Sequence, residues 1–185
     1  PIDRFPILIN GSDIAGEFYR RNLGDLFSYV QNRIPEIANE IYKIDDALKA
    51  GFGWENGPFE IWNKIGLDKG IELIEKQGKK VNDWVKELSK THKKFYNTTN
   101  SKLHYYDLES KEFLVKPGQD AFIILDNIDK TKEVFKNSGA TLKDIGDGIL
   151  NLEFTSKMNT LGGDVISAIN KSIDTAEKDF RGLVI

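Results

Sequence analysis

The sequence contains no cysteine, which excludes disulfide bonds and thiolate metal sites and fits a reducing compartment. It has only two histidines, His92 and His104, and neither has a second histidine or a carboxylate at the spacing of a metal site. We therefore expect both to be ordinary solvent-facing side chains. No apolar run is long enough to span a membrane, and no basic segment followed by an apolar core marks a signal peptide.

The sequence also has no excess of positive charge. The 26 basic residues are outnumbered by 29 acidic residues, so the net charge is −3 and we expect no nucleic-acid partner. With 30% charged and 39% hydrophobic residues among 185, the composition is that of a globular chain with one core or two small ones. The chain starts at Pro1 rather than at methionine and stops on the apolar run FRGLVI, so we expect a fragment of a longer polypeptide.

The first half of the sequence is helical by its periodicity. Residues 13–50 carry apolar side chains at steps of three or four, which places on one helix face Leu26, Val30, Ile34, Ile37, Ile41, Ile44 and Leu48. Pro35 lacks the N–H that the helical ladder needs, so we expect a kink or restart near Arg33. Residues 22–25 would permit another break. Shorter helices are expected from Pro58 to Gly66, from Asp68 as a cap to Gln77, and over 81–90.

The stretch ALKAGFGWENGPFEIWNKIG separates two of these helical patterns. Gly51 is the expected left-handed helix stop, Gly53 extends the loop, and Gly57 with Pro58 starts the next helix, whose first apolar residue is Phe59. The glycine spacing loosely resembles a phosphate-binding loop. Such a loop follows a strand, however, and this one follows a helix. We therefore expect a structural corner.

Glu55 and Glu60 flank this corner. Two carboxylates could form an acid–base pair if they shared a pocket and had different pKa values. We favour a structural interpretation, because Glu60 falls in the first turn of a helix, where the helix dipole stabilises a carboxylate.

Beyond Lys90 the sequence becomes aromatic and β-prone. We expect a hairpin or meander over 93–116, a short strand over 121–127, and a short helix or loop over 130–139. A glycine-rich turn, Gly146-Asp147-Gly148, predicts a second hairpin over 140–154.

The end of this hairpin, a helix over 162–180 and a final strand over 182–185 predict a strand–helix–strand unit that opens a parallel-stranded domain. The helix carries on one face Val165, Ile166, Ile169, Ile173 and Ala176. The final strand, GLVI, is apolar, and we expect it to form an exposed edge that favours association.

The segment Ser156–Asp164 joins a strand to this helix, the position where α/β enzymes place ligand loops. Gly162 and Gly163 precede the helix, so its N-terminus could meet an anion. From the residues alone, a connecting turn and a binding loop are equally good interpretations.

Two stretches resemble known families. IDDALKAGFGWENGPFEIWNKIGLDKG is similar to the C-terminal helical domain of the (S)-3-hydroxyacyl-CoA dehydrogenases, whose pattern has an Ile-Asp-x-Ala helix, a glycine–aromatic–glycine turn, Gly-Pro-Phe-Glu and a Gly-Leu-Asp ending. The matching residues are Ile44, Asp45, Ala47, Gly51, Gly53, Gly57, Pro58, Phe59, Glu60, Ile65, Gly66, Leu67 and Asp68.

The second stretch, residues 145–185, resembles the opening of an enoyl-CoA hydratase/isomerase (crotonase) domain. Its family pattern leads from a strand through a Lys-Met-Asn-x-Leu loop and a helix to a Gly-Leu-Val-Ile strand. The resemblance implies that a loop near the CoA contains the candidate substrate-binding residues Lys157, Met158, Asn159 and Leu161. Thr160 departs from the family, which usually has alanine there.

This order of domains resembles the bacterial fused β-oxidation proteins. The implied fold is mainly α, a dehydrogenase C-terminal-domain-like bundle, followed by a β-rich linker and an incomplete α/β crotonase-like segment. The expected domains are a helical domain over 1–92, a β-hairpin linker over 93–138, and a truncated enoyl-CoA hydratase/isomerase domain over 139–185.

The resemblance also implies a function. The parent would oxidise (S)-3-hydroxyacyl-CoA with NAD and hydrate or isomerise enoyl-CoA in the bacterial cytoplasm. The family's NAD fingerprint and catalytic residues lie in parts that this sequence does not contain, so we expect the fragment to be inactive, with no catalytic residue and no bound cofactor or metal. Implied partners are acyl-CoA, the Rossmann and crotonase parts of the parent, and a second copy. The alternative is a non-enzymatic helical dimerisation or interaction module.

Overall fold

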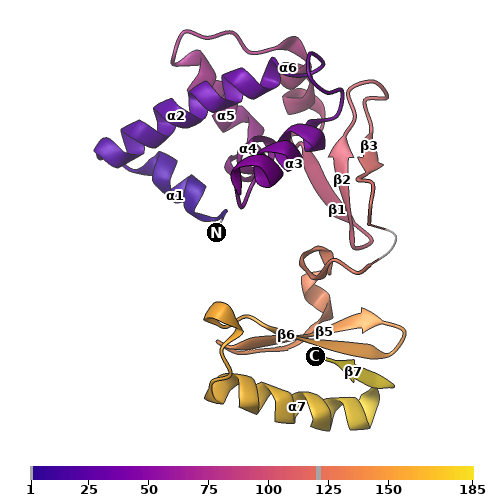
Figure 1. Cartoon of the computed structure of the whole chain (residues 1–185). Coiled ribbons are helices and arrows are strands. Elements are labelled where there is room, and N and C mark those ends of the chain that lie inside the picture. The colour runs from indigo at the N-terminus through magenta and orange to yellow at the C-terminus, as the bar shows by residue number, and fades with distance from the viewer. Residues whose placement is uncertain (1, 120–121) are drawn as a thin grey trace. The chain divides into compact units, whose positions relative to one another are not determined.

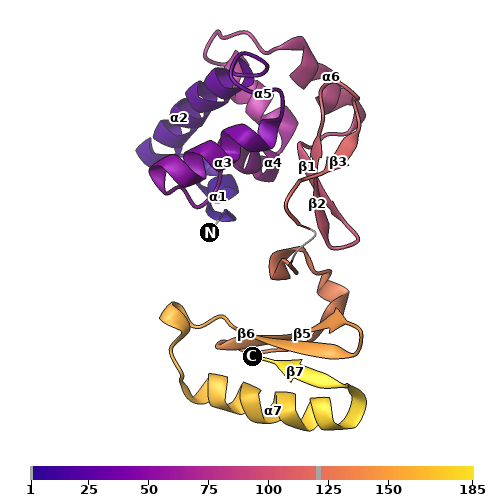
Figure 2. The same cartoon turned by 45° about the vertical axis from the view of Figure 1, so that its right-hand side comes forward.

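The computed structural model describes residues 2–119 and 122–185, which form two compact units (Figures 1 and 2). Unit 1 spans Pro1–Pro117 and unit 2 spans Gly118–Ile185. Within the described ranges, seven α-helices and two small sheets give a mixed helical and β architecture. None of these helices combines the length and hydropathy that a bilayer span requires.

Unit 1 contains six helices and one sheet. The helices are α1 Arg4–Asn10, α2 Ile14–Gln31, α3 Ile41–Phe52, α4 Pro58–Ile65, α5 Leu67–Glu75 and α6 Asp83–Thr91. Their core centres on Trp62, whose ring stacks on Phe27 with centroids 4.7 Å apart. The Trp62 indole N–H donates to the Leu67 carbonyl at 3.2 Å, so this fully buried ring keeps its polar atom satisfied.

The predicted helix over 13–50 is two helices, separated by residues 32–40. The interruption falls at Pro35, whose ring and missing N–H are incompatible with a helix interior. The other predicted break, at residues 22–25, is wrong, because α2 runs through Gly24. Gly24 allows α2 to pack closely against α5 and the residues that follow it. A Cβ on Gly24 would lie 2.3 Å from Nε2 of Gln77 and 2.9 Å from the Leu73 carbonyl oxygen.

Asp68 does not cap α5 as predicted. The helix begins one residue earlier, at Leu67, and its N-cap residue is Gly66 with φ 102°. Asp68 lies in the first turn, where its carboxylate accepts a hydrogen bond from the Ser89 hydroxyl of α6. The residue therefore ties two helices together.

The predicted meander forms a three-stranded antiparallel sheet, with β1 Tyr96–Thr99, β2 Lys102–Tyr106 and β3 Phe113–Val115. Its buried aromatic residues belong to the same hydrophobic cluster as the helices: Phe95, Tyr96, Tyr105 and Tyr106. Asn63 of α4 fixes the sheet by accepting from the Phe95 and Tyr96 amides, at 2.7 and 3.2 Å. The first compact unit therefore includes this sheet and ends at Pro117, and the predicted domains over 1–92, 93–138 and 139–185 stay a prediction.

Unit 2 is a four-stranded sheet covered by one helix (Figure 1). The strands are β4 Glu133–Lys136, β5 Ala140–Gly146, β6 Ile149–Phe154 and β7 Gly182–Val184, in that spatial order. β4, β5 and β6 pair antiparallel, whereas β6 and β7 are parallel and are joined by α7 Gly163–Asp179. The predicted β-hairpin and strand–helix–strand unit are both confirmed.

Two predictions for the first part of unit 2 were wrong. The described part of 121–127, residues 122–127, contains a 3₁₀ turn, η1 Leu125–Asn127, and no strand; residue 121 lies outside the described residues. Residues 130–139 were predicted as helix or loop but hold the short η2 turn Lys130–Lys132 and then β4. β4 forms because β5 offers it an edge, with Phe135 opposite Leu142.

The buried face of α7 agrees with the prediction in part, because Val165 is buried and Ile169 and Ala176 are half-buried and pack against the core of this unit. Val165, Ala168 and Ser172 are buried, whereas Ile166 and Ile173 are 49% and 42% exposed. Ala168 and Ser172, which the predicted face did not include, take inward positions, and Ile166 and Ile173 of that face do not.

Candidate functional site

The glycine–proline corner joins α3 to α4. Gly53, with φ 67°, is the left-handed residue that ends α3, whereas the predicted stop at Gly51 lies inside the helix. Gly57 is the N-cap residue of α4, and Pro58 occupies its first turn. A Cβ on Gly57 would lie 2.2 Å from the Cβ of Asp45, so only glycine fits there.

Asp45 is the buried polar centre of this corner. Its carboxylate accepts hydrogen bonds from the Phe59 amide at 2.8 Å, the Glu60 amide at 3.1 Å and the Tyr96 hydroxyl at 2.6 Å. Burial raises the pKa of Asp45 to about 7, partly offset by the hydrogen bond from Tyr96. The sequence showed Asp45 only as part of a motif. A carboxylate beside apolar Ile44, on the inward side of a helix, was the available signal.

Glu60 has the structural role that its position predicted. Its carboxylate accepts from the Gly57 amide at 2.8 Å and pairs with the Lys49 ammonium at 2.6 Å. It therefore completes the N-terminal cap of α4, as a carboxylate in a first turn is expected to do.

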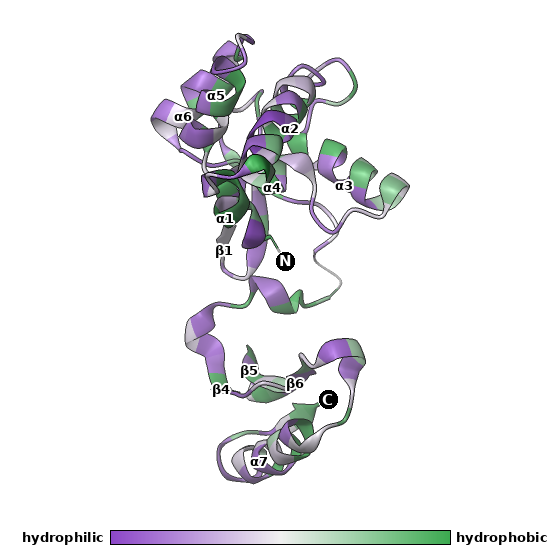
Figure 3. Cartoon of the chain, turned by 90° about the vertical axis from the view of Figure 1, so that its left-hand side faces the viewer, coloured by the Kyte–Doolittle hydropathy of each residue, from purple (hydrophilic) through white to green (hydrophobic). Residues whose placement is uncertain are grey.

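Two adjacent cavities lie beside the corner, with volumes of about 410 and 360 Å³. They share Leu26 and Trp54. We call the smaller one the apolar groove; apart from Arg33, it is lined by Leu26, Tyr29, Val30, Ile37, Ile44, Ala47, Leu48, Phe52 and Trp54. At its rim, Ile37 and Phe52 are 65% and 75% exposed. Figure 3 shows hydrophobic residues along α3. Such an exposed apolar concavity is typical of an interaction surface.

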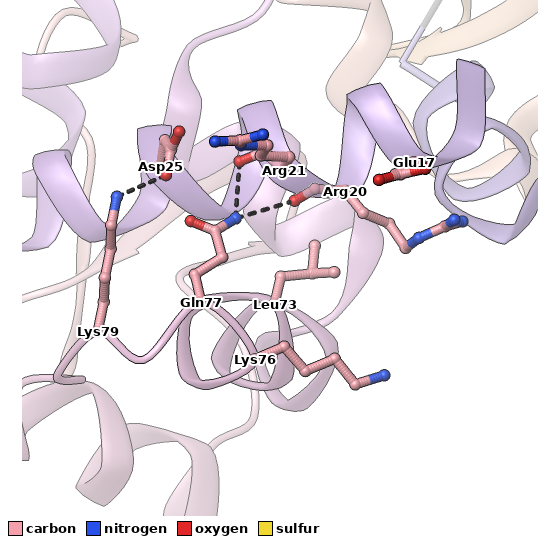
Figure 4. Close-up of a pocket in the computed structure, with 8 residues that line it drawn as sticks. All are labelled: Glu17, Arg20, Arg21, Asp25, Leu73, Lys76, Gln77 and Lys79. Carbon is pink, nitrogen blue, oxygen red and sulfur yellow. Dashed lines mark hydrogen bonds and ion pairs between the residues drawn. The ribbon is translucent and has the colours of Figure 1, made fainter. Parts of the chain in front are cut away.

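A third cavity, of about 650 Å³, is charged (Figure 4). Lys79 pairs with Asp25 at 2.5 Å, and the Gln77 side-chain amide donates to the Arg21 carbonyl at 2.7 Å. The Arg20 guanidinium donates to the carbonyls of Ile9 and Gly11 at the end of α1. These polar groups connect α1, α2 and the end of α5, so we interpret them as structural.

The candidate CoA loop lies in unit 2 as an exposed connection between β6 and α7. It contains the short turn η3 Lys157–Asn159, and Met158 and Leu161 are 91% and 62% exposed. Two internal hydrogen bonds close it, from the Ser156 hydroxyl to the Thr160 carbonyl and from the Thr160 hydroxyl to the Lys157 carbonyl. This geometry is that of a connecting turn, and the binding role of Lys157, Met158, Asn159 and Leu161 stays a prediction.

The two histidines lie outside any such site. His92 packs against Tyr106 and Phe113, with ring centroids 5.7 and 5.4 Å apart. A ring nitrogen of His104 lies 2.9 Å from the Lys102 carbonyl oxygen. Across the described residues, no cluster of three histidine, cysteine or acidic side chains has metal-binding geometry.

Comparison with known proteins covers almost the whole chain. Over 180 residues it is 40% identical to a Bacillus subtilis (strain 168) protein provisionally named 3-hydroxyacyl-CoA dehydrogenase, an alignment that includes 96% of this chain and 23% of that protein. The chain is related to a protein named as a 3-hydroxyacyl-CoA dehydrogenase. Two further relatives, from Rickettsia prowazekii (strain Madrid E) and Rickettsia felis (strain ATCC VR-1525 / URRWXCal2), are provisionally named fatty acid oxidation complex trifunctional enzyme.

These two relatives are 26% and 24% identical over 178 residues, again along 96% of this chain and 22% of theirs. The dehydrogenase-related chain thus spans less than a quarter of the length of the curated relatives it matches. No protein-family model matches it, and no solved structure matches it significantly.

Proposed function

We propose that the chain is a segment of a larger fatty-acid oxidation enzyme. The parent oxidises (S)-3-hydroxyacyl-CoA with NAD and hydrates or isomerises enoyl-CoA. The observation that carries this proposal is the 40% identity along 96% of the chain to a relative named as a dehydrogenase. In this reading, unit 1 is a dehydrogenase C-terminal-like helical domain and unit 2 begins a crotonase domain.

The role proposed for unit 1 is architectural. The buried carboxylate of Asp45 and the capping carboxylate of Glu60 both bind the start of α4, so neither is positioned for acid–base chemistry on a substrate. NAD would bind elsewhere in the parent, and this segment alone would be inactive.

The apolar groove supports an additional contact role. Phe52 and Ile37 expose large apolar surfaces beside a concavity, which is costly in water unless another surface covers them. This observation also favours the alternative function, a non-enzymatic interaction module. The two functions differ in one respect: only the enzyme parent transfers hydride.

The test is an assay of the full-length protein that contains this segment. We expect NAD reduction with (S)-3-hydroxyacyl-CoA and, in a separate assay, hydration of enoyl-CoA. Phe52→Gln in the groove should lower the dehydrogenase rate, whereas Ile14→Gln, a control at an 86% exposed residue outside the groove, should leave it unchanged. A full-length protein without dehydrogenase activity would contradict the enzyme proposal and favour the interaction module.

A further inference from the structure

The apolar groove of unit 1 has two helical walls. One wall follows α2 and the turn after it from Leu26 to Arg33, and the other follows α3 from Ile44 to Phe52. On each wall the lining residues recur at steps of three or four, as on one face of a helix. At the helical rise per residue, the α3 wall is about 12 Å long, or a little over two turns of a helix.

The rim of the groove calls for a large occupant. Ile37, Phe52 and Tyr29 are 65%, 75% and 57% exposed around a concavity of about 360 Å³. A small-molecule pocket encloses most of its ligand, whereas covering these side chains takes a protein surface. Both walls are helices and have no free strand edge, so an added β-strand finds no backbone partner. A helix lying along the groove is the recognition mode that fits.

Arg33 gives this apolar surface one charge. Among the described residues that line the groove, it alone is charged. Its guanidinium lies 4.8 Å from the centroid of the Tyr29 ring and pairs with Glu36 at 2.8 Å. The Glu36 side chain is 59% exposed, so this pair contributes little. The Nε–H of Arg33 is buried and has no acceptor among the described residues, so the guanidinium is incompletely paired and can take a second carboxylate.

The same charge argues against a second copy placed groove to groove. A twofold contact brings the same patch of both copies together, and the described lining contains no acidic side chain to meet Arg33. The occupant must therefore supply the carboxylate. The chain covers 23% of the relative named as a dehydrogenase, so most of such a protein lies outside this segment and is available to cover the groove.

We propose that the apolar groove binds an amphipathic helix from another part of the parent polypeptide. The helix lays apolar side chains at i, i+3 or i+4, and i+7 into the groove and carries a carboxylate where it passes Arg33. This inference rests on one part of the proposed function, that the chain is a segment of a larger protein. It names the surface that covers Phe52 and Ile37.

Photo-crosslinking in the full-length protein that contains this segment tests the proposal. p-Benzoylphenylalanine replaces Phe52 in the groove, and in a matched control it replaces Ile14, which is 86% exposed outside the groove. Mass spectrometry should locate an intramolecular cross-link from position 52 to one segment that has helical apolar spacing and an acidic residue on the same face. Position 14 should give no cross-link to that segment.

A charge exchange tests the role of Arg33. Arg33→Glu should lower the yield of this cross-link at least about tenfold, because it places like charges together, and replacing the partner's acidic residue with lysine should restore it. Arg21→Glu, the same charge change outside the groove, should leave the yield unchanged. If Arg33→Glu does not fold, Arg33→Gln replaces it, with an expected loss of about threefold. A proline in the middle of the partner segment should abolish the cross-link, because it breaks a helix.

Four results would overturn the proposal. These are no cross-link from position 52, a cross-link to a second copy or to a separate protein, a partner segment that tolerates proline, and a yield that the Arg33 variants leave unchanged. Dehydrogenase activity without the cross-link would refute the docked helix and leave the enzyme proposal standing. The cross-link in a full-length protein without dehydrogenase activity would do the reverse.

Discussion

At the scale of single residues, two glycines of the corner differ in whether a side chain would fit at their position. Gly57 must be glycine because Asp45 occupies the place of its side chain. Gly51 lies inside α3, and nothing lies within 4 Å of the position that a Cβ would take. The sequence presented both as corner glycines, and only the packing around each one distinguishes their roles.

This difference gives a matched pair of variants. Gly57→Ala should lower the free energy of unfolding by about 2 kcal/mol or more, because the new methyl group overlaps Asp45. Gly51→Ala should raise it by about 0.5–1 kcal/mol, since alanine restricts the unfolded chain more than glycine does. Urea unfolding of the two variants measures both changes. Equal destabilisation by both would show that the corner is not packed as described.

Asp45 also gives global stability a pH dependence. The pKa of Asp45 is raised in the folded state to about 7, so the folded protein binds a proton at this residue more tightly than the unfolded chain does. The stabilisation that this gives is fully present below the unfolded-state pKa and is lost as pH rises toward 7. The free energy of unfolding of the wild type relative to Asp45→Asn should therefore decline between about pH 4 and about pH 7. Urea titrations at several pH values measure this difference in the free energy of unfolding. A difference that increases from about pH 4 to about pH 7 would contradict the prediction.

At the scale of elements, the sequence predicted what local chemistry determines. The start of α4 at Gly57-Pro58 and the β-hairpin turn around Asp147 were predicted correctly, because proline and glycine act through their own backbone geometry. β4 and the inward positions of Ala168 and Ser172 on α7 were not, because each depends on a neighbour that local patterns do not reveal. The same holds for the candidate site: Asp45 gains its role only through partners 14 to 51 residues away.

The orientation of α7 can be tested by substitution on its two faces. Ala168→Leu should lower the free energy of unfolding by about 1–3 kcal/mol, because Ala168 is fully buried against the sheet. Ile173→Gln, on the 42% exposed face, should change it by less than about 0.5 kcal/mol. Thermal or urea unfolding measures the two. If Ile173→Gln were the more harmful change, Ile173 would lie on the packed face of α7, as the sequence predicts.

At the scale of the whole chain, two separate cores determine the organisation. The first cluster contains buried residues from Ile9 to Tyr106, and the second contains residues from Ala140 to Ala168. Residues 1–117 expressed alone should therefore fold cooperatively, with NMR signals that overlay those of the full chain. Loss of dispersed signals in this shorter chain would mean that unit 1 requires unit 2.

The central proposal is that this chain is an architectural segment of a fatty-acid oxidation enzyme and does not itself catalyse hydride transfer. The most direct measurement incubates the purified 185-residue chain with acetoacetyl-CoA and NADH and follows NADH absorbance, with the full-length protein assayed in parallel. We predict NADH oxidation by the full-length protein and none by the chain above the buffer control. NADH oxidation by the 185-residue chain itself would contradict the proposal.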